Sequence, residues 1–197
     1  MAIRELTYEE MRVILNDISE NEFEANGSSR AVYSYYCGGK QYAVKLAIGI
    51  HGERQTALEC ERYEDCPDRL AHIYARYGNH MIVSEWVSNI WEIVDYYTCG
   101  RLGIMDDEKY AKFAENQGYT EQQLNEICDG IEDTLNVMYD LQGDTSDNEQ
   151  IGINDNGEVV SFDYGYTEGE FERLAGNLSN YDYTAYLPMF YEKLGIE

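Results

Sequence analysis

The chain has 197 residues, 44% of them hydrophobic, and this size suits one domain or two small lobes that share a core. No apolar run approaches the roughly 20 residues of a membrane span. Its 14 basic and 38 acidic residues give a formal net charge of −24, which argues against direct binding of nucleic acid. The charge fits a solubilising surface, attraction to a basic partner, or imitation of a nucleic-acid backbone. Five scattered cysteines and a start without a secretory pattern predict reduced thiols in the cytoplasm.

The first half of the chain alternates helical and strand patterns. Thr7 and Glu10 have the spacing of a capping box, and apolar residues follow at helical period, so we predict a helix over 7–20. The glycine pair Gly38-Gly39 predicts a tight hairpin turn. The further elements expected here are strands over 23–25, 31–37 and 41–47, a loop over 48–53, a helix over 53–66 whose inner side carries Ala57, Cys60 and Tyr63, and strands over 71–77 and 81–87.

The second half is mostly helical in pattern. Residues 87–89 are predicted to form a hinge into it, and the turn signal from Asn154 to Gly157 predicts a hairpin near its end. The expected elements are helices around 91–97, within 101–118 and over 120–141, strands over 151–153 and 159–163, and one or two short helices after 166. The predicted domains are an N-terminal helix over 1–21, a sheet with a helix over 22–88, and a helical part over 89–197.

Two charged residues stand at the ends of predicted strands. Lys45 ends the segment Tyr42-Ala43-Val44-Lys45, and Asp163 follows an apolar strand and precedes Tyr164-Gly165. A lysine and an aspartate in such places are the minimum for holding a nucleoside triphosphate and its metal ion. The sequence therefore predicts a nucleotide site if these two side chains meet.

The order of the elements and these motifs resembles the protein-kinase-like fold over residues 22–165, especially its small, reduced members in bacteria and their viruses. The resemblance implies an α+β, bilobal architecture, in which an N-terminal antiparallel sheet plus helix precedes a reduced, mostly helical C-terminal lobe with a β-hairpin. It also implies ATP and Mg²⁺ as cofactors.

The resemblance also assigns roles to residues. In the glycine-rich loop pattern G-x-G-x-x-G-x-V, only Gly27 keeps a glycine, and Arg30 stands at the third glycine position, where it could add a cation near phosphates. Lys45 matches the lysine that pairs with the α/β phosphates, and Glu59, fourteen residues later, is the best match for the helix glutamate that holds it. Glu53, Glu61 and Glu64 remain open as alternatives. Asp163 matches the aspartate that binds magnesium.

The catalytic loop departs from the family pattern, because no His-Arg-Asp is present. Counting back from Asp163 in the family spacing puts Gln150 at the metal-binding asparagine position and Thr145 at the catalytic aspartate position. The candidates for the base are the nearby aspartates Asp144, Asp140 and Asp147, in that order. A solvated acidic loop without catalytic function is the alternative.

Three functions remain open at this point. We favour a kinase-like protein with a degenerate catalytic loop, a pseudokinase-type acidic interaction or inhibitor protein that a phage could encode. Its basic partner would be a protein such as a nucleic-acid-handling enzyme. The alternative is an active, compact phosphotransferase that uses ATP and Mg²⁺ on a protein or a small molecule. The third is an acidic globular protein whose kinase-like order is a coincidence.

Overall fold

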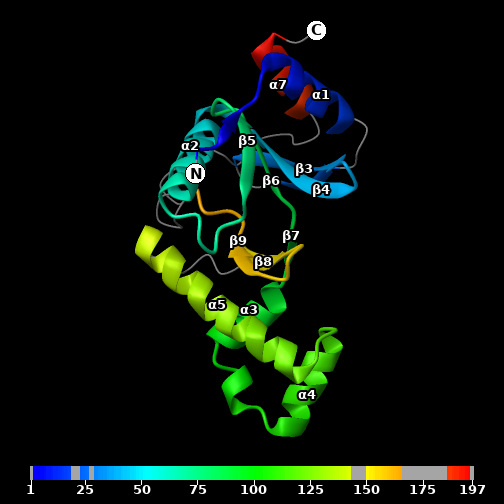
Figure 1. Cartoon of the computed structure of the whole chain (residues 1–197), viewed down its shortest axis with the longest axis vertical. Helices are drawn as coiled ribbons and strands as arrows, with labels where there is room; N and C mark the ends of the chain where they lie inside the picture. Colours follow the sequence, from blue (N-terminus) through cyan, green and yellow to red (C-terminus); the bar gives the residue numbers. More distant parts are fainter. Residues whose placement is uncertain (1, 19–22, 27–28, 143–149, 166–185, 196–197) are drawn as a thin grey trace. The chain divides into compact units, whose positions relative to one another are not determined.

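The computed structural model describes residues 2–18, 23–26, 29–142, 150–165 and 186–195. It shows an α+β protein with a six-stranded mixed sheet, a three-stranded sheet and several helices (Figure 1). The chain divides into two compact units, each with its own hydrophobic core. Unit 1 comprises residues 1–67, 72–86 and 165–197, and unit 2 comprises residues 68–71 and 87–164.

Unit 1 is built on the six-stranded sheet, whose strand order is β1-β5-β6-β4-β3-β2. Its elements are β1 (Arg4–Glu5), α1 (Tyr8–Ile18), β2 (Phe23–Asn26), β3 (Arg30–Cys37), β4 (Lys40–Ala47), α2 (Gly49–Asp65), β5 (Ile73–Tyr77), β6 (Met81–Glu85) and α7 (Tyr186–Leu194). Strand β1 runs parallel to β5, so the expectation of a purely antiparallel sheet is wrong at this edge. A strand of two residues is too short to leave a periodic pattern in the sequence.

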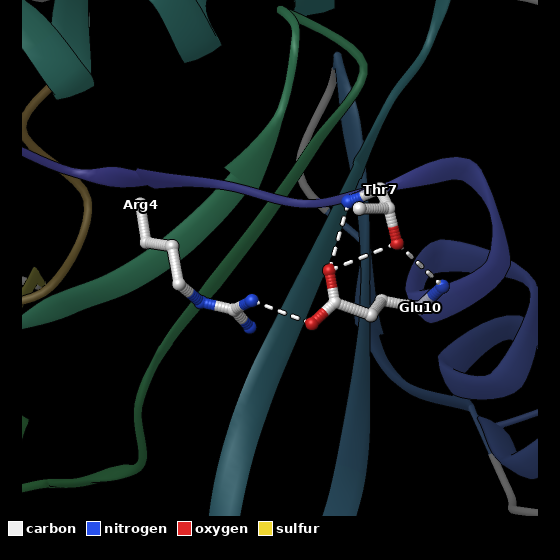
Figure 2. A network of polar contacts seen from close by, with 3 residues as sticks. All are labelled: Arg4, Thr7 and Glu10. Carbon is white, nitrogen blue, oxygen red and sulfur yellow. Dashed lines mark hydrogen bonds and ion pairs between the residues drawn. The ribbon is translucent and has the colours of Figure 1, made fainter.

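The capping box predicted for the first helix is confirmed at the start of α1. The Thr7 amide donates to Glu10 Oε2 at 2.9 Å, and the Glu10 amide donates to Thr7 Oγ1 at 3.3 Å. Figure 2 shows the Glu10 side chain turned back toward Thr7, while its other carboxylate oxygen contacts the Arg4 guanidinium at 2.6 Å. The apolar positions of the helix are buried, as expected: Met11, Ile14, Leu15 and Ile18.

The predicted turn between β3 and β4 is also confirmed. Gly38 and Gly39 have φ angles of 61° and 80°, which glycine adopts without strain, and the two strands pair in register from Cys37↔Lys40 onward. One face of this sheet packs against α1 and α7, which lie side by side in Figure 1. The Tyr191 hydroxyl on α7 donates to the Leu15 carbonyl on α1 at 3.1 Å, which joins the two helices.

Helix α2 corrects one prediction, because it begins at Gly49 and residues 48–53 are therefore not a loop. Gly52 permits this start: a Cβ there would lie 2.2 Å from the Ser29 carbonyl oxygen, so only glycine lets the helix approach this closely. The buried side of α2 is also more polar than predicted, since Ala57 is only half-buried. It consists of Gly52, Gln55, Thr56, Glu59, Cys60 and Tyr63.

Unit 2 combines a three-stranded sheet, in the order β7-β8-β9, with helices. Its elements are β7 (Val87–Asn89), α3 (Trp91–Thr98), a 3₁₀ turn η1 (Leu102–Ile104), α4 (Asp107–Asn116), α5 (Glu121–Gln142), β8 (Ile151–Asn154) and β9 (Val159–Ser161). Residues 87–89, predicted as a hinge into the second half, form β7 and pair with β8, and the division between the two units falls just before them, between Trp86 and Val87. Their partner strand lies more than sixty residues away, so no local pattern marks the pairing.

The predicted hairpin of β8 and β9 and the predicted long helix are present and pack together. In the turn, Asn154 Oδ1 accepts hydrogen bonds from the amides of Asn156 and Glu158, each at 3.0 Å, and Gly157 has a φ of 82°. Helix α5 lies against β9, where the Thr134 hydroxyl donates to a β9 carbonyl at 3.1 Å. The core side of α5 includes Leu124, Ile127, Ile131 and Met138.

Candidate functional site

The centre of the candidate site is a buried ion pair between β4 and α2 in unit 1. Val44 and Leu46 of β4 point into the core beneath α1, so Lys45 between them points to the opposite face of the sheet. There its Nζ donates to Glu59 Oε1 at 2.5 Å, and the two side chains are only 6% and 1% exposed. The glutamate that the resemblance favoured is therefore the one in contact with Lys45.

The other three glutamates that the sequence left open make different contacts. Glu53 binds Lys193 on α7, Glu64 accepts a hydrogen bond from the Ile3 amide at 3.0 Å, and Glu61 is exposed. The predicted apolar stripe of Ala57, Cys60 and Tyr63 did not single out Glu59, because the buried side of α2 is wider than this stripe and includes polar residues. The burial of Glu59, set by how α2 docks on the sheet, is what distinguishes it.

A second cation, Arg30, shares the same carboxylate. In the β3–β4 register Arg30 lies opposite Ala47 and Val32 lies opposite Lys45, so Arg30 and Lys45 are on one face of the sheet. Arg30 Nη1 lies 2.5 Å from Glu59 Oε2, in an ion pair whose angle is not that of a directed hydrogen bond. The Arg30 side chain is 2% exposed, so each oxygen of Glu59 has a buried cation beside it.

Burying three charged groups is costly, since each loses its hydration and the attraction between them regains only part of that free energy. Such an arrangement is weak evidence for stability and is more typical of functional sites, where local packing rules are broken. The neighbouring Cys60 thiol is not a second reactive group. Burial, together with the nearby Glu59 charge, raises its pKa to about 11 and keeps it protonated.

Contacts around this ion pair fix the start of β3 against the start of α2. The Ser29 hydroxyl donates to the Gln55 side-chain oxygen, and the Ser29 carbonyl accepts from the Ile48 amide at 2.8 Å. The close approach at Gly52 belongs to the same junction. The backbone that carries Arg30 is therefore held to the helix that carries Glu59.

Gly165, the last residue of the Asp163-Tyr164-Gly165 motif, packs against the same helix. A Cβ at Gly165 would lie 2.5 Å from Gln55 Cγ and 2.7 Å from the Gln55 carbonyl oxygen. Gln55 is one helical turn before Glu59. The motif's glycine thus has a steric reason: any side chain there would collide with the backbone of α2.

The two predicted metal ligands occupy neighbouring positions in unit 2. The Phe162 amide donates to the Gln150 carbonyl at 2.9 Å, so Gln150 and Asp163 lie at the open end of the β8–β9 hairpin. Both residues are half-buried. Tyr164, the residue after Asp163, is fully buried, and its hydroxyl donates to the Ala71 carbonyl at 3.1 Å.

The remaining predicted residues lie apart or outside the described parts of the chain. Asp140 is exposed on the last turn of α5. Gly27, Asp144 and Asp147 fall outside the described residues. Within the described ranges, no group of three or more histidine, cysteine, aspartate or glutamate side chains is arranged to hold a metal ion.

Comparison with known proteins adds no relative, since the chain matches no protein-family model and no curated protein. Among the described helices, none combines the length and the apolar composition that crossing a membrane requires.

Proposed function

We propose that the chain is a kinase-like protein that binds a nucleoside triphosphate in unit 1. The observation that carries the proposal is the buried pair of Lys45 and Glu59, a strand lysine held by a glutamate of the following helix. A lysine fixed in this way can contact the α and β phosphates of ATP. The strand order β2-β3-β4-β6-β5 around it and the glycine contact of Gly165 with α2 support the same proposal.

We further propose that the protein acts on a basic protein partner, as a pseudokinase-type interaction or inhibitor protein. The catalytic loop lacks His-Arg-Asp, and Gln150 replaces the expected asparagine. Helix α5 carries six acidic residues and no basic one. Beside it, a groove of about 560 Å³ in unit 2 is lined by Glu126, Asp129, Asp133 and Glu158, and Arg69 already binds Asp133 there at 2.6 Å. A basic segment would find complementary charge on this surface.

The nucleotide proposal is tested by thermal denaturation with ATP and Mg²⁺. A ligand at 100 times its Kd stabilises the folded protein by about 2.7 kcal/mol, which gives a clear rise in Tm. Lys45→Met should abolish this rise, because it removes the phosphate contact while keeping the length of the side chain. Lys40→Met, on the same strand, is the matched control and should keep it. An equal rise in both variants would refute the assignment of Lys45.

The partner proposal is tested with a poly-lysine peptide as a probe. Raising the salt from about 0.01 M to about 1 M shortens the Debye length from about 30 to about 3 Å, so binding to an acidic groove should weaken steeply. The double change Glu126→Gln/Asp129→Asn should weaken binding at low salt more than the control Asp107→Asn/Glu108→Gln on α4. Both pairs remove two charges, so equal effects would show that net charge alone attracts the peptide.

An active phosphotransferase is the second candidate, and the placement of Gln150 and Asp163 at one end of the hairpin favours it. Asp163 would hold Mg²⁺ between the β and γ phosphates, with the Gln150 side-chain oxygen as a weaker ligand. Transfer of radiolabel from γ-labelled ATP to the protein or to a test acceptor would support this function if Asp163→Asn abolishes it. Binding of ATP with no transfer to any acceptor, including the chain itself, would leave the pseudokinase.

A further inference from the structure

Arg30 is the part of the buried cluster that the Lys45–Glu59 pair does not explain. A lysine needs one carboxylate to hold it, yet Glu59 holds a guanidinium as well. We propose that Arg30 binds the phosphate groups of the nucleotide together with Lys45, so that the site binds nucleoside triphosphate without a divalent metal ion. This inference rests on the nucleotide site proposed above and specifies its chemistry.

The strand register places Arg30 where it can act with Lys45. The two residues lie on the same face of neighbouring strands, two positions apart along the ladder. Diagonal neighbours of this kind are about 7–8 Å apart at their Cα atoms, within reach of one triphosphate for side chains of this length. Glu59 lies between them and orients each with a different oxygen, at 2.5 Å in both cases. Both cations are thus positioned before a ligand arrives.

The chemistry of arginine suits this role better than that of another lysine. A guanidinium has five N–H donors in a planar fork, so it can bind a carboxylate on one side and phosphate oxygens on another. It stays protonated at any ordinary pH, even when buried. A divalent ion in a nucleotide site neutralises charge on the β and γ phosphates, and a fixed guanidinium supplies positive charge at the same groups without an ion.

The test measures the Kd of ATP by isothermal titration calorimetry, once with Mg²⁺ and once with EDTA, for the wild type and for Arg30→Lys. Lysine keeps the positive charge beside Glu59 and loses the fork. We expect the wild type to bind about equally in both conditions. Arg30→Lys should bind at least about tenfold more weakly in EDTA, the effect of one lost hydrogen bond to a charged group, and Mg²⁺ should restore much of the affinity.

Arg4→Lys is the matched control, since Arg4 also pairs with a glutamate in unit 1 but is exposed at the surface. It should leave both Kd values unchanged. Wild-type binding that requires Mg²⁺ would overturn the inference and leave the nucleotide site standing. No binding in either condition would overturn both. A variant Arg30→Lys with a lower Tm but an unchanged ratio of the two Kd values would show that Arg30 serves only the fold.

Discussion

The strongest stability prediction concerns Glu59→Gln, which keeps the size of the side chain and removes its charge. Glu59 is 1% exposed and lies 2.5 Å from both Lys45 Nζ and Arg30 Nη1. The change leaves two buried cations without this counter-charge, and removing one partner of a buried ion pair costs about 3–5 kcal/mol. Because small proteins are stable by only about 5–15 kcal/mol, the variant should lose a large part of its folding free energy.

Urea unfolding followed by circular dichroism measures this loss. With a slope of about 1–3 kcal/mol per molar urea, the midpoint should fall by roughly 1 M or more at an unchanged slope. Glu61→Gln, an exposed residue on the same helix, should stay within about 0.5 kcal/mol of the wild type. A loss below about 1 kcal/mol for Glu59→Gln, the size expected of a surface pair, would refute the buried cluster.

Three further predictions concern other contacts. Gly52→Ala should lower the free energy of unfolding by about 2 kcal/mol, measured by thermal or urea unfolding. The new Cβ would lie 2.2 Å from the Ser29 carbonyl oxygen just before β3, and this clash outweighs the gain of up to about 1 kcal/mol in helix propensity. Tyr164→Phe should cost about 1–3 kcal/mol in the same assay, since it leaves the buried Ala71 carbonyl without its donor. The Glu10 carboxyl should titrate by NMR with a pKa of about 2, lowered from 4.5 chiefly by the Thr7 amide. Its contribution to stability is therefore complete above about pH 4.5 and disappears as the pH falls through about 2, a dependence that Glu10→Gln should lack.

Sequence patterns predicted the parts of the fold that are set by residues close together in the chain. The capping box of Thr7 and Glu10 and the turn at Gly38-Gly39 depend on contacts within four residues. Patterns failed where a distant segment decides the structure. The start of α2 depends on how Gly52 fits against Ser29, more than twenty residues earlier, and β7 exists because β8 pairs with it.

In the candidate site, too, the contacts that depend on distant segments were harder to predict than those that depend on nearby residues. The resemblance implied the pairing of Lys45 with Glu59 but left Glu53, Glu61 and Glu64 open, and the docking of α2 on the sheet decides among them. The contact of Arg30 with Glu59 was not predictable, since it depends on the β3–β4 register and on the docking of α2. The signal in the sequence is strand alternation, which puts Arg30 on the same face as Val32 once the strand begins at residue 30.

The two residues of β1 protect the outer edge of the six-stranded sheet. Arg4 and Glu5 pair with β5, and the next amide, that of Leu6, donates to the Arg76 carbonyl at 2.7 Å. Uncovered strand edges recruit strands of other molecules and seed aggregates. Proteolytic trimming of the first five residues should therefore expose this edge of β5 and make the trimmed protein prone to self-association, while the core residue Leu6 and helix α1 are retained.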